Sequence, residues 1–418
     1  MTKPTEARGK LGILTPGMGA VATTTYAGVF AARRGTAAPV GALSELGRLD
    51  LGNGKKPLIK DILPLAGLQD LVFGTWDPYG HDAFEAAVEA NVLSAKDLLP
   101  LEEEMRSIKP MKAVIDRNWV KRLEGSGNVK VTKSKWDAAQ TLIEDIQRFK
   151  AENSCDRLVM IWTASTEAYK EPGAVHQSVT DFEKGLKEDN AEISPSQIYA
   201  YAALKERVPF INGTPSVTID NPAFHELAME YGVPLAGKDF KTGQTLLKTI
   251  LGPGLKARML GLSGWFSTNI LGNRDGEVLE DPESFKSKEI SKKQVLESIL
   301  ESDLYPELYK DAYHKVRINY YPPRGDDKEA WDNIDIFGWM NYPMQIKVDF
   351  LCKDSILAAP LVLDLTRFMD LAHRAGARGT QTWLNFYFKA PMTDDGKPIN
   401  DLFDQRDEMN AMLRGWVK

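Results

Sequence analysis

The segment 10–35, KLGILTPGMGAVATTTYAGVFAARRG, has the pattern of a short apolar strand, a turn broken by glycines, and a helix. Within the turn, Gly17, Gly19 and Ala22 match the spacing G-x-G-x-x-A. Glycines at these points let the backbone approach a pyrophosphate, whose charge the positive end of the helix stabilises. The segment therefore predicts a dinucleotide-binding βα unit; an ordinary tight turn is the alternative.

One part of the dinucleotide pattern is absent. An acidic residue that binds the ribose hydroxyls is expected about 20 residues after the turn. No acidic residue lies near Ala37, and Glu45 and Asp50 come later. We therefore expect the adenosine end to be bound in another way.

Segments with helical spacing alternate with strand-like segments over most of the chain. Residues 135–150, KWDAAQTLIEDIQRFK, have a helical pattern, and residues 158–162 follow as a buried strand. Further along, Asn221 is placed to cap a helix that Gly232 closes. This alternation predicts an α/β fold with a doubly wound parallel sheet.

A different pattern begins near residue 245 and ends near residue 357. In QIKVDFLC, residues 345–352, apolar and polar side chains alternate, which predicts a half-exposed strand of an antiparallel or mixed sheet. Residues 356–376 then predict a long apolar helix, and TWLNFYFK, residues 382–389, a strand. We therefore expect an α+β domain inserted into the first domain, to which the chain then returns.

The composition favours a cytoplasmic enzyme without a nucleic-acid or membrane partner. The formal net charge of the 418 residues is −6, so there is no basic surplus. The two cysteines and five histidines lack the spacings of zinc sites, and no P-loop or G-x-S-x-G elbow is present. The N-terminus has no apolar leader, and the purest apolar run, residues 356–363, is too short to span a membrane.

Several longer strings occur together and in one order. They are VFGTWD, IWTASTE, INGTPS, GKDFKTGQT, NILGNRDG, FKSKEISKKQV, GDDKEAWD, CKDSILAAPL and NFYFKAP. With them the chain resembles the myo-inositol-phosphate synthases over residues 11–391, and more the compact prokaryotic members than the eukaryotic ones. The glycine turn departs from the eukaryotic pattern, because Ala20, Val21 and Ala22 replace its later glycine and asparagines.

This resemblance implies conversion of glucose 6-phosphate into 1D-myo-inositol 3-phosphate, for inositol and phospholipid biosynthesis, by a homotetramer with bound NAD. C5 is oxidised, a C6 proton is removed, C6 attacks the C1 aldehyde, and the C5 ketone is reduced back. The implied domains are a Rossmann-like NAD-binding domain (1–245), an inserted α+β catalytic and oligomerisation domain (246–357), and a C-terminal return (358–418). Members of the family differ in their use of divalent or monovalent cations, so no metal ligand is assigned.

The resemblance also implies roles for individual residues. The catalytic residues are Lys288 as a proton donor, Lys292 as a phosphate or alkoxide ligand, Lys328 and Lys389. The cofactor-binding residues are Gly17, Met18, Gly19, Ala20, Val21, Asp77, Thr163, Ala164, Asp239 and Asp354. The substrate-binding residues are Thr242, Gly243, Gln244, Thr245, Asn269, Leu271, Asn273 and Asp275.

The residues themselves leave simpler interpretations open. Lys288 and Lys292 are four apart and share a face if helical, and Asp327 is a candidate to orient Lys328. Without the resemblance, each lysine is more simply a surface charge, and KTGQT a hydrogen-bonded helix cap. The alternative functions are an NAD-dependent sugar or amino-acid dehydrogenase, which accumulates NADH, and a dinucleotide-sensing regulator without catalysis.

Overall fold

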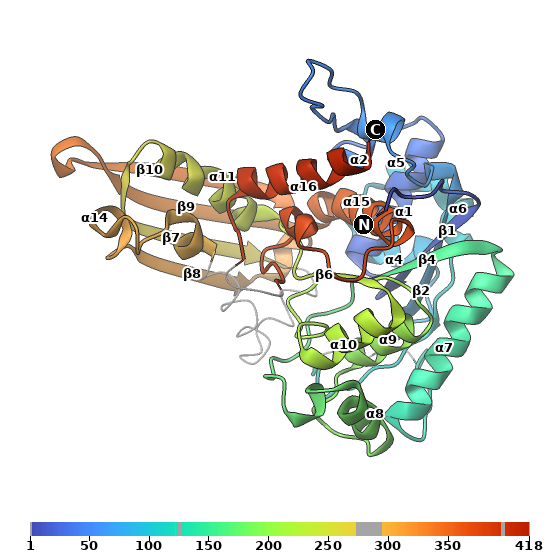
Figure 1. Cartoon of the computed structure of the whole chain (residues 1–418). Coiled ribbons are helices and arrows are strands. Elements are labelled where there is room, and N and C mark those ends of the chain that lie inside the picture. Colours follow the sequence, from blue (N-terminus) through green and yellow to red (C-terminus); the bar gives the residue numbers. More distant parts are fainter. Residues whose placement is uncertain are drawn as a thin grey trace.

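Two β-sheets form the framework of the computed structural model, which describes residues 2–121, 123, 125, 127–272, 295–393 and 398–417. Seven strands follow the order β11-β6-β5-β4-β1-β2-β3, and four follow the order β10-β9-β7-β8. The four-stranded sheet projects to one side of the body that surrounds the seven-stranded sheet (Figure 1).

The seven-stranded sheet is parallel throughout. From β1 in its interior, the chain passes to β2 and β3 on one side and then crosses to β4, β5, β6 and β11 on the other. This confirms the predicted doubly wound sheet, whose strand order reverses beside β1. The strands are β1 (Lys10–Pro16), β2 (Leu71–Asp77), β3 (Met111–Lys112), β4 (Cys155–Trp162), β5 (Phe210–Asn212), β6 (Pro234–Gly237) and β11 (Gly379–Thr380).

Helices cover both faces of this sheet. One core contains buried side chains of α1 (Ala20–Arg33), α4 (Ala83–Ala90), α6 (Glu102–Ser107), α15 (Asp354–Arg374) and α16 (Leu402–Trp416). The other contains those of α7 (Lys135–Glu152), α8 (Val179–Lys187), α9 (Pro195–Lys205) and α10 (Pro222–Tyr231). Shorter helices are α2 (Leu43–Leu46), α3 (Ile59–Ile62), α5 (Ala95–Leu98) and α14 (Pro306–Tyr309).

Local sequence signals account for the helix ends. Helix α10 begins after Asn221, whose side chain accepts from the Phe224 amide at 3.3 Å, and ends at Gly232 with a φ of 68°. Ser134 caps α7 in the same way by accepting from the Asp137 amide. Helix α10 confirms the boundaries that Asn221 and Gly232 predicted, and α7 confirms the helical pattern of residues 135–150.

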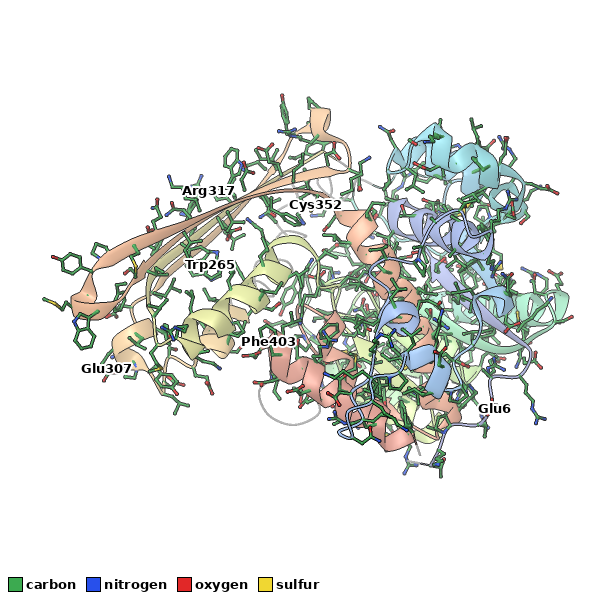
Figure 2. The ribbon with its side chains drawn as sticks, turned by 90° about the horizontal axis from the view of Figure 1, so that it is seen from above. Glu6, Trp265, Glu307, Arg317, Cys352 and Phe403 are labelled. Atoms are coloured by element: carbon green, nitrogen blue, oxygen red, sulfur yellow. The ribbon has the colours of Figure 1, made fainter. Side chains whose placement is uncertain are left out.

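The smaller sheet is mixed. Strand β9 (Asp327–Phe337) pairs antiparallel with β10 (Pro343–Lys353) and β7 (Gly261–Leu271), and β7 pairs parallel with β8 (Tyr313–Tyr320). Helix α11 (Gly243–Ala257) packs against its inner face, and the burial of β10 alternates as predicted. In Figure 2, Trp265 lies on the α11 side of this sheet and Arg317 on the opposite side.

The chain returns to the first domain after β10, but one predicted strand is wrong. Residues 356–376 lie almost entirely in the long helix α15, as expected, whereas TWLNFYFK contains the 3₁₀ helix η6 (Thr382–Tyr387). Its aromatic residues are buried, Trp383 against Phe368 of α15, so the run has no alternation that would separate a strand from a helical turn. The domain boundaries at 245 and 357 remain predictions, and α11 and α15 begin within three residues of them.

No helix in the described part of the chain is long and apolar enough to cross a lipid bilayer.

Candidate active site

A cavity of about 570 Å³ lies at the carboxyl ends of the central parallel strands and extends to the start of α15. Ligands of doubly wound folds bind at this edge of the sheet. Every residue predicted to bind the cofactor is among those that line the cavity: Gly17, Met18, Gly19, Ala20, Val21, Asp77, Thr163, Ala164, Asp239 and Asp354. Lys389 and Thr242 line it as well.

The two glycines of the turn serve different purposes. Gly17 has a φ of +89°, and a Cβ there would lie 2.5 Å from the Cα of Ala164, so the fold itself requires glycine. A Cβ on Gly19 would meet no described protein atom within 4 Å and would project into free space beside the cavity. Helix α1 starts directly afterwards with no side-chain cap and no acidic residue in its first turn. The turn therefore fits a pyrophosphate.

Asp77 is the carboxylate beside this turn. It ends β2, and its two oxygens accept from the amides of Met18 at 2.7 Å and Tyr79 at 2.9 Å. The expected spacing of about 20 residues fails because α2, α3 and further loops lie between α1 and β2. Glu45 instead forms a buried ion pair with Arg367 at 2.7 Å.

Lys389 and Asp239 form a buried pair in the cavity wall. Lys389 is 6% exposed and Asp239 is 4% exposed. The Nζ of Lys389 lies 3.4 Å from the Oδ1 of Asp239. The Lys389 amide also donates to the Asp239 carbonyl at 2.7 Å, so a backbone hydrogen bond joins the two segments that carry the pair. The other carboxylate oxygen of Asp239 has no partner among the described residues.

A second lysine–aspartate pair joins the four-stranded sheet to helix α15. Lys328 at the start of β9 has its Nζ 3.2 Å from Oδ2 of Asp354, the first residue of α15. The structure thus pairs Lys328 with Asp354, whereas Asp327 points to the opposite face of the strand. A Cβ on Gly243 would lie 3.6 Å from this Nζ, so the N-terminus of α11 is adjacent to the pair.

The predicted substrate residues gather around that helix start. Thr242 precedes α11 without a side-chain capping bond, and the side chains of Gln244, Thr245 and Asn269 are buried beside it. Leu271 ends β7 next to Gly272, which lines the cavity. Four predicted residues lie outside the described residues: Lys288, Lys292, Asn273 and Asp275.

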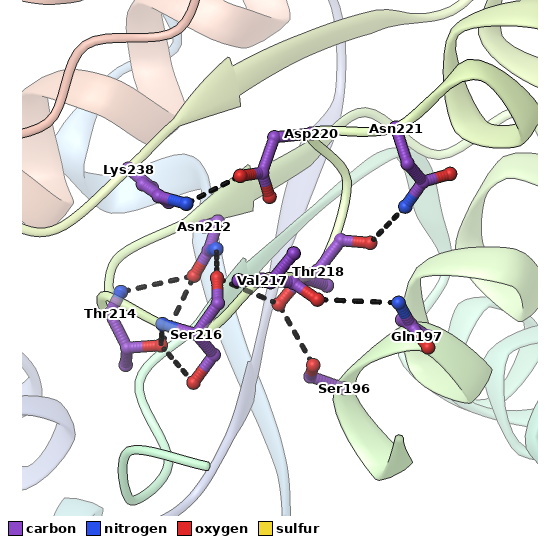
Figure 3. Close-up of polar contacts among 10 residues, drawn as sticks. All are labelled: Ser196, Gln197, Asn212, Thr214, Ser216, Val217, Thr218, Asp220, Asn221 and Lys238. Atoms are coloured by element: carbon purple, nitrogen blue, oxygen red, sulfur yellow. Dashed lines mark hydrogen bonds and ion pairs between the residues drawn. The ribbon is translucent and has the colours of Figure 1, made fainter. Parts of the chain in front are cut away.

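The loop after β5 forms another wall of the cavity through Gly213, Thr214 and Pro215. Thr214 donates to the Asn212 Oδ1 at 3.1 Å through its amide, and the Asn212 Nδ2 donates to the Ser216 carbonyl at 2.8 Å (Figure 3). These bonds hold the loop to the strand end. The string INGTPS drew attention to this loop in the sequence, but no residue of it was assigned a role.

Two buried polar residues near this site, Asp332 and Lys241, were assigned no role from the sequence. Asp332 is 3% exposed and lies on the inner face of β9, two positions beyond Ala330 and four beyond Lys328. Burial lowers the pKa of Lys241, near the start of α11, to about 7. The alternation along β9 is the signal that would have placed Asp332 on the same face as Lys328.

Within the described residues, no three histidine, cysteine, aspartate or glutamate side chains gather in a way that would hold a metal ion.

A doubly wound sheet, an uncapped helix behind a glycine turn, and a cavity lined by the buried Lys389 together define an enzyme that uses a bound dinucleotide. A family model described as myo-inositol-1-phosphate synthase, built for an NAD-binding domain, matches residues 11–414. The chain belongs to this family, and its dinucleotide is NAD.

Individual relatives agree with this membership. An inositol-3-phosphate synthase 1 from Bacteroides thetaiotaomicron is 53% identical over 98% of this chain and 96% of its own length. The inositol-3-phosphate synthase of Saccharomyces cerevisiae is 32% identical over 97% of this chain and 85% of its own length. The crystal structure of inositol-3-phosphate synthase from Caenorhabditis elegans has a TM-score of 0.91 at 27% identity, covering 99% of this chain and 86% of that chain.

Proposed function

We propose that this protein isomerises D-glucose 6-phosphate to 1D-myo-inositol 3-phosphate and leaves NAD unchanged after each turnover. The observation that carries the proposal is the position of two lysine–aspartate pairs in or beside the cavity that begins at the glycine turn: the buried Lys389–Asp239 and the partly buried Lys328–Asp354. Family membership supplies the reaction. A plain dehydrogenase or a regulator without catalysis is not favoured by these relatives.

Three groups of the chain hold the cofactor. The free amides at the start of α1 bind the pyrophosphate, and Asp77 accepts from the ribose hydroxyls. Thr163 and Ala164, directly after β4, line the nicotinamide side. NAD held by these residues would supply hydride-accepting and hydride-donating chemistry at C5 of the substrate.

The lysines act on charge that develops in the substrate. After C5 is oxidised, loss of a C6 proton places negative charge on the C5 oxygen, and the ammonium group of Lys389 stabilises it. Attack of C6 on C1 then converts the aldehyde oxygen into an alkoxide, which takes up one proton in place of the one lost from C6, so the cyclisation releases no net proton. Asp239 keeps the Lys389 ammonium in place through this sequence.

Lys328 and residues 242–245 hold the phosphate. The N-terminus of α11 supplies backbone amides, and Lys328 supplies a positive charge next to them. Anchoring the phosphate fixes C5 and C6 of the sugar relative to Lys389, which lowers the entropic cost of cyclisation. Lys288 and Lys292 remain predicted participants in proton transfer and phosphate binding.

Purified protein incubated with glucose 6-phosphate and NAD tests the proposal. We expect inositol phosphate to form while the NADH absorbance does not rise with product. A dehydrogenase would produce one NADH for each substrate consumed, and a regulator would bind NAD without product. Either result would refute the proposed reaction.

We further propose a homotetramer that uses the outer face of the four-stranded sheet. Phe266, Trp331 and Leu351 on this face are 39%, 47% and 60% exposed, which is a large apolar surface for a single chain. Basic Arg317 on β8 and acidic Asp349 on β10 lie on the same face, so a second copy turned by a two-fold axis offers opposite charges. Light scattering should give a tetramer for the wild type and smaller species for Leu351→Asp; a wild-type monomer would refute this.

We also propose a cytoplasmic location and a role in inositol and phospholipid biosynthesis. Cys155 and Cys352 are both free thiols, which fits a reducing compartment. Cell fractionation with an antibody to the protein would test the location, and recovery of the protein outside the cytoplasm would contradict it.

A further inference from the structure

Asp332 joins three hydrogen-bond donors beneath the candidate substrate site. Its Oδ1 accepts from the Trp265 indole nitrogen at 2.7 Å and from the Ser267 hydroxyl at 2.5 Å. Its Oδ2 accepts from the side-chain nitrogen of Gln244 at 2.9 Å. Because an ionised carboxylate only accepts hydrogen bonds, it satisfies all three donors together.

This carboxylate fixes the direction of the Gln244 amide. The amide nitrogen also donates to the carbonyl oxygens of Thr268 and Trp331, at 3.2 Å each, so acceptors surround it. The Gln244 oxygen therefore points the other way and accepts from the side-chain nitrogen of Asn269. With its nitrogen engaged, Asn269 has its carbonyl oxygen Oδ1 left over.

That oxygen is buried and has no partner among the described residues. Asn269 is only 1% exposed. A buried acceptor without a partner lowers the stability of the fold unless a ligand or a water molecule donates a hydrogen bond to it. Its strand neighbour is Ala330, and Lys328 lies two residues further along the same face of β9. The unpaired oxygen thus belongs to the group of residues proposed to bind the sugar phosphate.

We propose that Asp332 is a positioning residue for substrate recognition: through Gln244 it orients Asn269 so that Oδ1 accepts a hydrogen bond from a sugar hydroxyl. The inference rests on the proposed function and deepens it. The predicted substrate-binding roles of Gln244 and Asn269 do not include Asp332. They also do not say which atom of each amide faces the substrate.

The substitution Asp332→Asn tests the direction of the chain. Asparagine keeps the shape, but its NH₂ group must face either the Trp265 N–H or the Gln244 NH₂, and both are donors. The Trp265 side holds two donors, the indole N–H and the Ser267 hydroxyl, so we expect the NH₂ group to face Gln244. The Gln244 amide then loses the carboxylate oxygen that fixes it, and Asn269 loses its orientation. Asp335→Asn is the matched control, because Asp335 lies on the outer face of the same strand and bonds to Asn333 and Gln345.

The assay compares hydroxyl groups with fluorine, which cannot donate a hydrogen bond. Enzyme loaded with NADH, which cannot oxidise C5, is titrated calorimetrically with glucose 6-phosphate and with its 2-, 3- and 4-monofluoro deoxy analogues. For wild type and Asp335→Asn, we expect one analogue to bind about three- to tenfold more weakly than the parent, the range for one neutral hydrogen bond. For Asp332→Asn, we expect this preference to fall below about twofold, while NADH affinity is retained.

The outcomes separate a positioning role from a structural one. If Asp332 only stabilises the fold, its substitution lowers all affinities by a common factor and leaves the hydroxyl preference unchanged, which would overturn the inference. If the variant does not fold, the wild-type titration decides: equal affinities for the parent and all fluoro analogues would overturn the inference alone. A wild type that binds glucose 6-phosphate but forms no inositol phosphate would refute the proposed function separately.

Discussion

The space beside Gly19 makes the cofactor site testable without harming the fold. A Cβ there meets no described protein atom within 4 Å, so Gly19→Val should fold normally. The valine side chain would occupy the approach to the first turn of α1, where the pyrophosphate accepts from backbone amides. Loss of one such charge-assisted hydrogen bond costs about 1.5–3 kcal/mol. NAD affinity should therefore fall roughly 10- to 150-fold.

Gly17 should respond in the opposite way. Its φ of +89° and the 2.5 Å approach of a Cβ to the Ala164 backbone make Gly17→Ala a folding defect. The left-handed conformation alone costs about 1–2 kcal/mol, and the contact with Ala164 adds to this. The melting temperature should fall for Gly17→Ala and stay unchanged for Gly19→Val.

Calorimetric titration with NAD, together with thermal unfolding, measures both effects. Gly28→Ala is the control, because Gly28 lies exposed within the same helix with nothing near its added Cβ. Alanine there should leave NAD affinity unchanged and raise stability by about 0.5–1 kcal/mol. A folded Gly19→Val protein with wild-type NAD affinity would refute the assignment of this turn to the pyrophosphate.

Other substitutions test the lysines. Lys328→Ala should weaken glucose 6-phosphate binding by about 1.5–3 kcal/mol, and equal calorimetric affinity would contradict its role in phosphate binding. Lys389→Met should keep NAD and its fold but lose about two powers of ten in turnover; near-normal turnover would return it to a structural role. Because burial lowers the pKa of Lys241 to about 7, the unfolded chain binds more protons above that pH, and stability should rise from pH 7 to 9. Lys241→Met should make this rise smaller but not abolish it, because burial also lowers the pKa of Lys248 to about 8. An equal rise in melting temperature from pH 7 to 9 for wild type and Lys241→Met would refute the assignment to Lys241.

Short-range patterns were sufficient to predict most of the fold. Capping by Asn221 and closure by Gly232 define α10, and the alternation in residues 345–352 identifies the half-exposed strand β10. The prediction of a strand for residues 382–389 failed because most of their side chains are buried, and such a run has no alternation that would distinguish a strand from a helical turn. Strand order and the return of the C-terminal helices depend on contacts between distant segments, which local patterns do not encode.

The candidate site was predicted less completely. Spacing alone missed Asp77, because the segment between α1 and β2 separates it from the glycine turn; the family resemblance was needed to select it. The partner of Lys328 is Asp354, which lies 26 residues away in sequence and is brought close by the start of α15. Asp332 carried no signal beyond its place in an alternating strand, since its importance lies in three donors from other segments.

The late position of α15 in the chain bears on how the protein is made. This helix packs against α1 and β4, yet it leaves the ribosome only after the entire four-stranded sheet has been synthesised. Until then the growing chain leaves uncovered the parts of α1 and β4 that α15 covers in the finished protein. Synthesis thus includes a long interval in which the nucleotide-binding half is unfinished and open to aggregation, so its yield in cells should depend on chaperones that bind nascent chains.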